Sequence, residues 1–223
     1  MEIEPFLRFL SFAVFFLIFF ITYYRRTTRV VRARFNSLAA SLNGRVKSVL
    51  GLNFSLGADY RGLPIQITYS PGDNNRPPSL AIAARRRPPF RFRLQKQDWN
   101  TRLSSRLGLA RGFKSTDPDF DQRFFASTGD RNRCAVFLAD VRNRSELEAL
   151  AEAGWQVEFG RRQALIRKKL TRTPIVFREE LRKRNLRNAA REIFGLSNAA
   201  ADFSETELLQ VLERFERLLR NLM

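Results

Sequence analysis

The sequence contains no histidine and only one cysteine, Cys134, in 223 residues. Within this chain, these absences exclude imidazole and thiolate zinc sites, Cys-His pairs, Ser-His-Asp triads and intrachain disulfide bonds. The phosphate-loop and GxSxG nucleophile motifs are also missing. Cys134 lies in the apolar stretch CAVFLA, which indicates a small buried side chain rather than a reactive thiol. We therefore predict no catalytic residue, no cofactor and no metal site, in a protein that is not an enzyme.

Closely spaced acidic residues are equally scarce, and Asp117, Asp119 and Asp121 form the only dense group. Their D-x-D-x-D spacing is similar to that of a calcium loop. However, Gln122 stands where the glycine is expected, and Thr128 stands in place of the bidentate glutamate. We interpret the three aspartates as Asx turns that lead into a strand. Acid-base chemistry at these carboxylates is the enzymatic alternative.

Positive charge, by contrast, is abundant. The chain has 40 Lys and Arg against 22 Asp and Glu, a formal net charge of +18. Residues 25–50 carry +7, residues 51–97 carry +6 and residues 161–223 carry +7, whereas residues 98–160 carry −1. Such an excess has to be matched by anionic lipid, nucleic acid or an acidic partner.

Residues 5–24, PFLRFLSFAVFFLIFFITYY, contain a single charge, Arg8. At 1.5 Å per residue a helix of this length spans about 30 Å, so we predict a transmembrane helix. Glu2 and Glu4 precede it where a cleaved signal peptide would have basic residues, so the helix should stay attached. By the positive-inside rule, the arginines that follow place the domain in the cytoplasm and residues 1–4 outside. The expected lipid-headgroup contacts are Arg25, Arg26, Arg29, Arg32 and Arg34.

Three further segments follow the predicted span. Residues 25–44 are expected to form a basic juxtamembrane helix that ends at Asn43-Gly44. Residues 45–172 are expected to form a cytoplasmic α+β domain, and residues 173–223 a helical C-terminal segment. In that segment Ser204 and Glu207 form a capping box, followed by an apolar stripe at helical spacing. We expect the stripe to dock on the sheet; an oligomerising coiled coil is the alternative, and the oligomeric state is left open.

Period-two alternation dominates the central domain and predicts a mainly antiparallel sheet of six or seven strands with packed helices. A PH-like barrel closed by the C-terminal helix is the alternative fold. Two short helices are expected between residues 134 and 154, the second with Ser145 and Glu148 as a capping box and Gly154 as its stop.

The stretch RRRPPFRFRLQKQ, residues 85–97, has six basic side chains and no acid. Its alternation places Phe90, Phe92 and Leu94 in the core. Arg85 to Arg87 with Pro88-Pro89 are expected at the tip of a hairpin. The segment is a possible basic patch, made of Arg85, Arg86, Arg87, Arg91 and Arg93.

The segments GADYRGLP and GFKSTDPDFDQRFFAST resemble a class of uncharacterised bacterial membrane proteins. That class carries a T-x-D-x-x-F-D-x-x-F segment. Here Asp117, Phe120, Asp121 and Phe124 fit this form, with Thr116 directly before Asp117. The resemblance covers roughly residues 30–190 and implies a hydrophobic anchor before a soluble α+β domain, with no activity. This chain departs from the pattern in its many arginines and its additional C-terminal helix.

Together these features favour a single-pass membrane protein that acts as a scaffold or accessory subunit of a membrane complex. Its basic domain is expected to lie against anionic lipid and to have a protein partner in the membrane. The alternative is a membrane-tethered nucleic-acid-binding protein. Nucleic acid is the less favoured partner because the aromatic residues fall on the core face of their strands and no RNP-like motif accompanies them.

Overall fold

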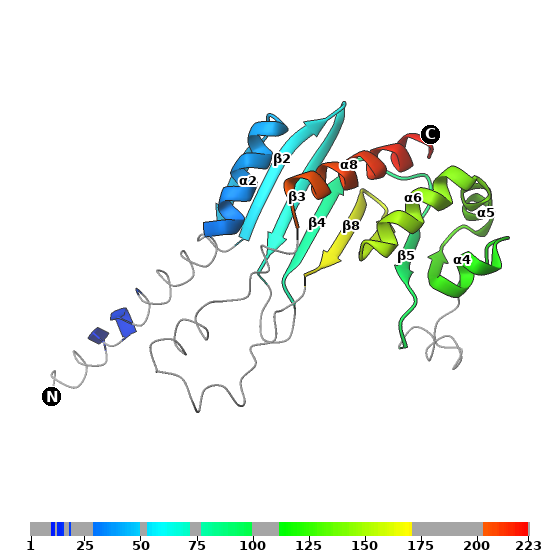
Figure 1. The fold of residues 1–223 in the computed structure, drawn as a ribbon, viewed down its shortest axis with the longest axis horizontal. Coiled ribbons are helices and arrows are strands. Elements are labelled where there is room, and N and C mark those ends of the chain that lie inside the picture. The colour runs from blue at the N-terminus through cyan, green and yellow to red at the C-terminus, as the bar shows by residue number, and fades with distance from the viewer. Residues whose placement is uncertain are drawn as a thin grey trace.

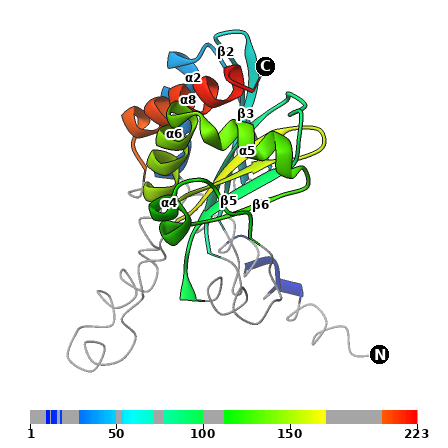
Figure 2. The ribbon, with the colours of Figure 1, turned by 90° about the vertical axis from the view of Figure 1, so that its right-hand side faces the viewer.

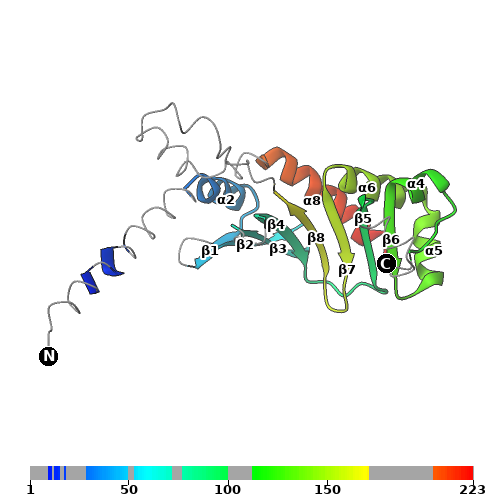
Figure 3. The ribbon, with the colours of Figure 1, turned by 90° about the horizontal axis from the view of Figure 1, so that it is seen from below.

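The computed structural model describes residues 10–11, 13–15, 18, 29–49, 53–71, 77–99, 112–170 and 203–222. They form an eight-stranded antiparallel sheet with helices against one face, as Figures 1 and 3 show. The predicted α+β class is confirmed. The strands are β1 (Arg45–Val49), β2 (Asn53–Tyr60), β3 (Leu63–Ser70), β4 (Ser79–Ala84), β5 (Phe92–Lys96), β6 (Phe124–Thr128), β7 (Trp155–Phe159) and β8 (Ala164–Lys169). The described helices include α2 (Arg29–Ser41), α4 (Pro118–Arg123), α5 (Arg131–Ala139), α6 (Val141–Glu152) and α8 (Glu205–Arg220).

The strand order across the sheet is β1-β2-β3-β4-β8-β7-β5-β6. β1 to β4 are successive neighbours in one half, and β5 to β8 form the other half. The halves join along one seam, where β4 pairs with β8 from Ser79↔Lys169 to Ala84↔Ala164. α8 crosses in front of this seam, on the same face as α2 and α6 (Figures 1 and 2).

Alternation along the strands separates the two faces of the sheet. Phe54, Ile67, Ile82, Val157 and Ile166 are all fully buried on the helical face. The helices contribute the facing apolar side chains, and the stripe on α8 is buried against them. Each large apolar side chain buried in this way stabilises the fold by about 1.5 to 3 kcal/mol. The predicted docking of the C-terminal helix on the sheet is thus confirmed.

Local signals at the helix ends behave largely as expected. The Ser204 hydroxyl accepts a hydrogen bond from the Glu207 amide at 3.1 Å, which confirms the N-terminal cap of α8. α2 ends before Asn43, which has a φ of 48°. At Gly44 a Cβ would lie 2.9 Å from the carbonyl oxygen of Gly57, so only glycine allows β2 to approach this closely. Gly154, with a φ of 85°, ends the helix before β7.

Four expectations differ from the structure. The sheet has eight strands rather than six or seven, because β1 adds to its edge by pairing with β2. β1 was not expected because nearly all of its residues are exposed, so it lacks a buried face. The sheet of the described residues is open, since β1 and β6 lie at opposite edges, so the barrel is wrong for this part of the chain. α6 begins four residues before Ser145 because the Asp140 side chain accepts from the Arg142 amide at 2.8 Å and caps the helix there. α4 precedes β6, where only a turn was expected.

No helix in the described part of the chain is long and apolar enough to cross a membrane. Most of the predicted span, residues 5–24, lies outside the described residues. Its described positions, 10–11, 13–15 and 18, are helical. Residues 1–4, Arg25 and Arg26 also lie outside the described residues, as do residues 171–202 of the predicted C-terminal segment.

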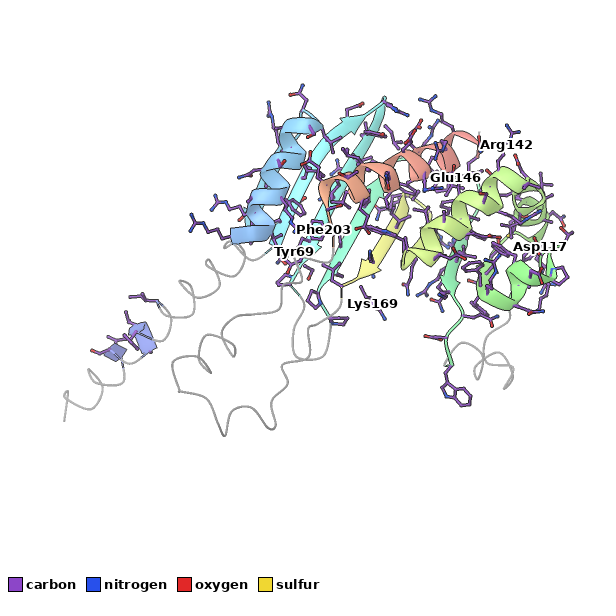
Figure 4. All side chains as sticks on the ribbon, in the orientation of Figure 1. Tyr69, Asp117, Arg142, Glu146, Lys169 and Phe203 are labelled. Carbon is purple, nitrogen blue, oxygen red and sulfur yellow. The ribbon has the colours of Figure 1, made fainter. Side chains whose placement is uncertain are left out.

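The strands give the sheet two ends, which the register defines. Val49, Asn53, Ser70, Ser79 and Lys169 lie in one row across β1, β2, β3, β4 and β8. α2 begins near this row, and Figure 4 shows Tyr69, Lys169 and Phe203 there. We call this the entry end of the sheet, because the chain enters the domain here. The opposite end, with the β2–β3 and β7–β8 turns, is the far end.

Candidate functional site

The three aspartates considered for acid-base chemistry have local structural contacts. Asp117 caps α4 by accepting from the amides of Asp119 and Phe120 at 3.1 Å, and it lies 3.6 Å from Arg144. Both carboxylate oxygens of Asp121 accept from the Ser115 amide at 3.0 Å. These bonds agree with the Asx-turn interpretation. Among the described residues, no cluster of His, Cys, Asp or Glu could hold a metal ion.

Cys134 is fully buried in α5, as its apolar surroundings in the sequence predict. Burial raises the pKa of its thiol to about 11, because the charged thiolate is poorly solvated there. The thiolate is the nucleophilic form of cysteine, so this side chain is unreactive in the folded domain.

Acidic side chains of the helical face are neutralised by arginines and lysines of the same domain. Glu146 of α6 lies 2.8 Å from Arg214 and 2.7 Å from Arg217 of α8. Arg123 pairs with Glu148 at 3.0 Å and with Glu152 at 2.9 Å. Further pairs on this face are Lys168 with Glu207 and Arg220 with Glu216. The pair of Arg220 with Glu216 lies within α8. The other contacts cross between α8, α6, α4 and β8, so they join the helices to one another and to the sheet.

The predicted lipid contacts fall into two groups. Arg29 and Arg32 are exposed on the first turns of α2. Arg34 is half-buried, donates a hydrogen bond to the Phe203 carbonyl, and has its guanidinium carbon 5.3 Å from the centre of the Phe203 ring. This arginine therefore joins α2 to the residue that precedes α8.

A second contact between α2 and α8 reinforces the first. The hydroxyls of Ser37 and Ser41 both donate to the Glu205 carboxylate. These hydrogen bonds lower the pKa of Glu205, since they stabilise its charged form. We call these five residues, Arg34, Ser37, Ser41, Phe203 and Glu205, the α2–α8 clasp.

Exposed apolar side chains mark the entry end. Val49, the last residue of β1, is 65% exposed. Trp99 follows β5, which runs from the far end to the entry end, and it is 73% exposed. Lys96 and Lys169 are exposed at the entry ends of β5 and β8. Sequence analysis missed this combination, because Val49 and Trp99 are separated by 50 positions and only the sheet brings their strands to one end.

The arginine-rich stretch after β4 lies at the far end of the sheet. The Arg85 amide donates to the carbonyl of Pro64, near the start of β3, at 3.0 Å. β8 and β7 separate β4 from β5, so the predicted hairpin with Arg85 to Arg87 at its tip is wrong. The segment is a crossover, because β4 and β5 each pair with strands that come later in the sequence.

Within this crossover the assignment of side chains to the core is correct. Phe90, Phe92 and Leu94 are buried, and the rings of Phe90 and Phe92 lie 5.7 and 5.9 Å from that of Phe137 on α5. Arg85, Arg87, Arg91 and Arg93 are exposed, whereas Arg86 is half-buried.

A shallow pocket of about 470 Å³ opens at the far end between β5, β6 and β7. Arg91, Arg93 and Arg161 line it together with Glu158, which lies opposite Arg93 in the β5–β7 register. Ser127, Thr128, Gly129 and Gly160 complete the polar lining. The pocket therefore combines part of the predicted basic patch with an arginine of the β7–β8 turn that sequence analysis did not single out.

No family model matches the sequence, and no curated protein matches it either. Among solved structures, the chain is similar to the crystal structure of the mycobacterial trehalose monomycolate transport factor A, TtfA. The TM-score is 0.47 and the sequence identity 13%, over 88% of this chain and 96% of that chain. The two chains share too little for an activity or a partner to be transferred from one to the other.

Proposed function

We propose that this chain is a single-pass protein of the bacterial inner membrane, with residues 5–24 crossing the bilayer and residues 1–4 outside. Its cytoplasmic α+β domain serves as a non-enzymatic scaffold or accessory subunit of a membrane complex. The length of the apolar run and the arginines that follow it support this orientation.

The observation that carries the proposal is the composition of the entry end. α2, the first helix after the predicted span, begins at the same end of the sheet at which Val49 of β1 and, across the sheet, Trp99 after β5 are exposed. Tryptophan is favoured at the headgroup level of a bilayer, because its ring is apolar and its N–H is polar. Arg29, Arg32 and Lys169 add about 1 kcal/mol each near an anionic leaflet. The entry end therefore suits contact with the membrane surface.

Tryptophan fluorescence tests this orientation, since the chain has only two tryptophans and Trp155 is buried. In a Trp155→Phe variant of the full-length protein in anionic nanodiscs, emission comes from Trp99 alone. Brominated lipids should quench this emission, because quenching requires contact between the ring and the lipid chains or headgroups.

Val136 supplies a matched control. It lies on α5, which follows the far end of β6, and it is 76% exposed. A tryptophan placed by Val136→Trp in a Trp99→Phe, Trp155→Phe background should escape quenching. Equal quenching at both positions, or none at Trp99, would contradict the proposed orientation. A reporter protein that is active only in the cytoplasm should be active when it is fused to the C-terminus.

A further inference from the structure

The arginines of the far end lie too far from the entry end to contact the same membrane surface. β4 and β8 have six residues each, and at roughly 3.3 Å per residue they separate the two ends by about 20 Å. Screening at physiological ionic strength acts over about 8 Å. If the proposed orientation holds, anionic lipid does not account for the charge at the far end.

Several of these arginines also have no acidic partner among the described residues. Arg91, Arg93 and Arg161 line the shallow pocket, and none of them forms an ion pair with a described residue. Arg85, Arg87 and Arg162 are exposed nearby, on the crossover and on the β7–β8 turn. We call these six residues the far-end arginine surface.

We propose that the far-end arginine surface binds an acidic segment of a protein partner, and this proposal rests on the membrane orientation proposed above. The guanidinium group is planar and binds a carboxylate through two parallel hydrogen bonds. Three guanidinium groups around one pocket can therefore hold successive carboxylates of a Glu- or Asp-rich segment.

Two observations favour a polypeptide over a nucleic acid. Binding of single strands relies on exposed aromatic rings that stack on bases. Phe90, Phe92 and Phe159 are buried at the far end, and the exposed large apolar residues of the described chain include no aromatic residue there. In addition, Glu158 places a negative charge in the pocket, which repels a continuous phosphate backbone but can meet a basic or polar residue within a peptide.

The acidic cluster on the described helical face of a second copy fits the surface poorly. Glu146, Glu148 and Glu152 of the helical face already have arginine partners within the domain. Binding them in trans would break these pairs. The expected occupant is thus a different protein that exposes unpaired carboxylates.

The test uses the full-length protein in nanodiscs of neutral lipid at physiological salt, so that lipid charge does not compete. The probe is a labelled dodecapeptide of alternating Glu and Ser, with a Gln and Ser peptide as the neutral reference. We expect the acidic peptide to bind at least about tenfold more tightly. The triple variant Arg91→Gln, Arg93→Gln, Arg161→Gln should lower its affinity by about tenfold or more, since three charge-assisted contacts are removed.

A charge-matched control separates this surface from the general excess of positive charge. Arg45→Gln, Lys47→Gln and Arg167→Gln remove three exposed charges from the same face of the sheet, outside the pocket. This variant should retain the affinity to within about threefold. Equal losses in the two triple variants, or an absence of peptide binding, would overturn the proposal.

Two further measurements complete the test. Tighter binding of a dodecamer of thymidine than of the acidic peptide would reject the polypeptide in favour of nucleic acid. Quenching of Trp99 by brominated lipid should be unchanged in the pocket variant. If the acidic peptide does not bind but brominated lipid still quenches Trp99, only the present inference is rejected. If brominated lipid does not quench Trp99 in the unaltered chain, the membrane orientation is rejected.

Discussion

The two faces of the sheet carry their charges differently. On the helical face, acidic residues of α6 and α8 form ion pairs with nearby arginines and lysines, and these pairs surround a continuous apolar core. On the open face, Arg45, Lys47, Arg93 and Arg167 are exposed and have no ion pair with a described residue. The charges of the described residues are therefore arranged unevenly: those on the helical face hold the helices together, whereas these four on the open face are exposed to solvent.

The largest expected difference between the faces concerns stability. Phe215 of α8 is fully buried, and Phe215→Ala should lower the free energy of unfolding by about 3 to 5 kcal/mol through lost burial and the cavity left behind. Arg167→Ala on the open face should change it by less than about 0.5 kcal/mol. Urea denaturation followed by circular dichroism measures both values. Similar losses in the two variants would remove the distinction.

Glu146 tests whether the ion pairs of the helical face contribute to stability. Glu146→Gln weakens two contacts to α8, with Arg214 and Arg217, whose side chains are each at least 40% exposed. Because solvent screens such pairs, the expected loss is about 1 kcal/mol. Glu158→Gln on the open face, where the carboxylate has no ion pair with a described residue, is the control and should be neutral. The same denaturation experiment compares them.

Asp117 variants distinguish the helix-capping role of this side chain from a contribution of its charge, which lies 3.6 Å from Arg144, when the free energy of unfolding is measured by urea denaturation. Asp117→Ala should cost about 1 kcal/mol, because two amides of α4 lose their acceptor. Asp117→Asn should retain most of the stability, since asparagine caps helices about as well as aspartate. A loss as large in the asparagine variant would show that the carboxylate charge matters more than the cap.

The smallest expected effect is the pH dependence of the α2–α8 clasp. The pKa of Glu205 is lower in the folded than in the unfolded chain, so the carboxylate stabilises the fold above its unfolded pKa, about 4.3. This contribution is lost as the pH falls through the folded pKa. The difference in Tm between the natural chain and Glu205→Gln should therefore be present at pH 7 and shrink in stronger acid. A difference independent of pH would contradict the assignment.

Features of the fold that depend on local chemistry could be predicted from the sequence. Alternation predicted six or seven strands, against the eight in the structure, and correctly placed Phe90, Phe92 and Leu94 in the core. The Ser204 cap was predictable because its partner, Glu207, lies three residues away. In each case the residues that decide the structure are close in sequence.

What could not be predicted depends on distant segments. β4 pairs with β8, about 80 residues later, and no periodicity within either strand specifies the other. The supposed hairpin after β4 was wrong for this reason. The candidate site was recoverable only in part: the arginines of the crossover were identified, but Arg161 and Glu158 join them through the β5–β7 pairing. The contact of Arg34 with Phe203 could not be predicted, because Phe203 is 169 positions away.

The seam between β4 and β8 sets the order in which the molecule can be assembled. Residues 79–84 leave the ribosome well before residues 164–169. Until β8 has been synthesised, the edge of β4 that it will pair with is therefore unpaired. Closing so long a loop is slow, because its entropy is lost before any contact compensates. α8, synthesised after β8, then covers the seam. The exposed edge of β4 is consequently the place where an emerging chain is most open to mispairing, and a truncation before residue 164, which removes β8, should aggregate during synthesis.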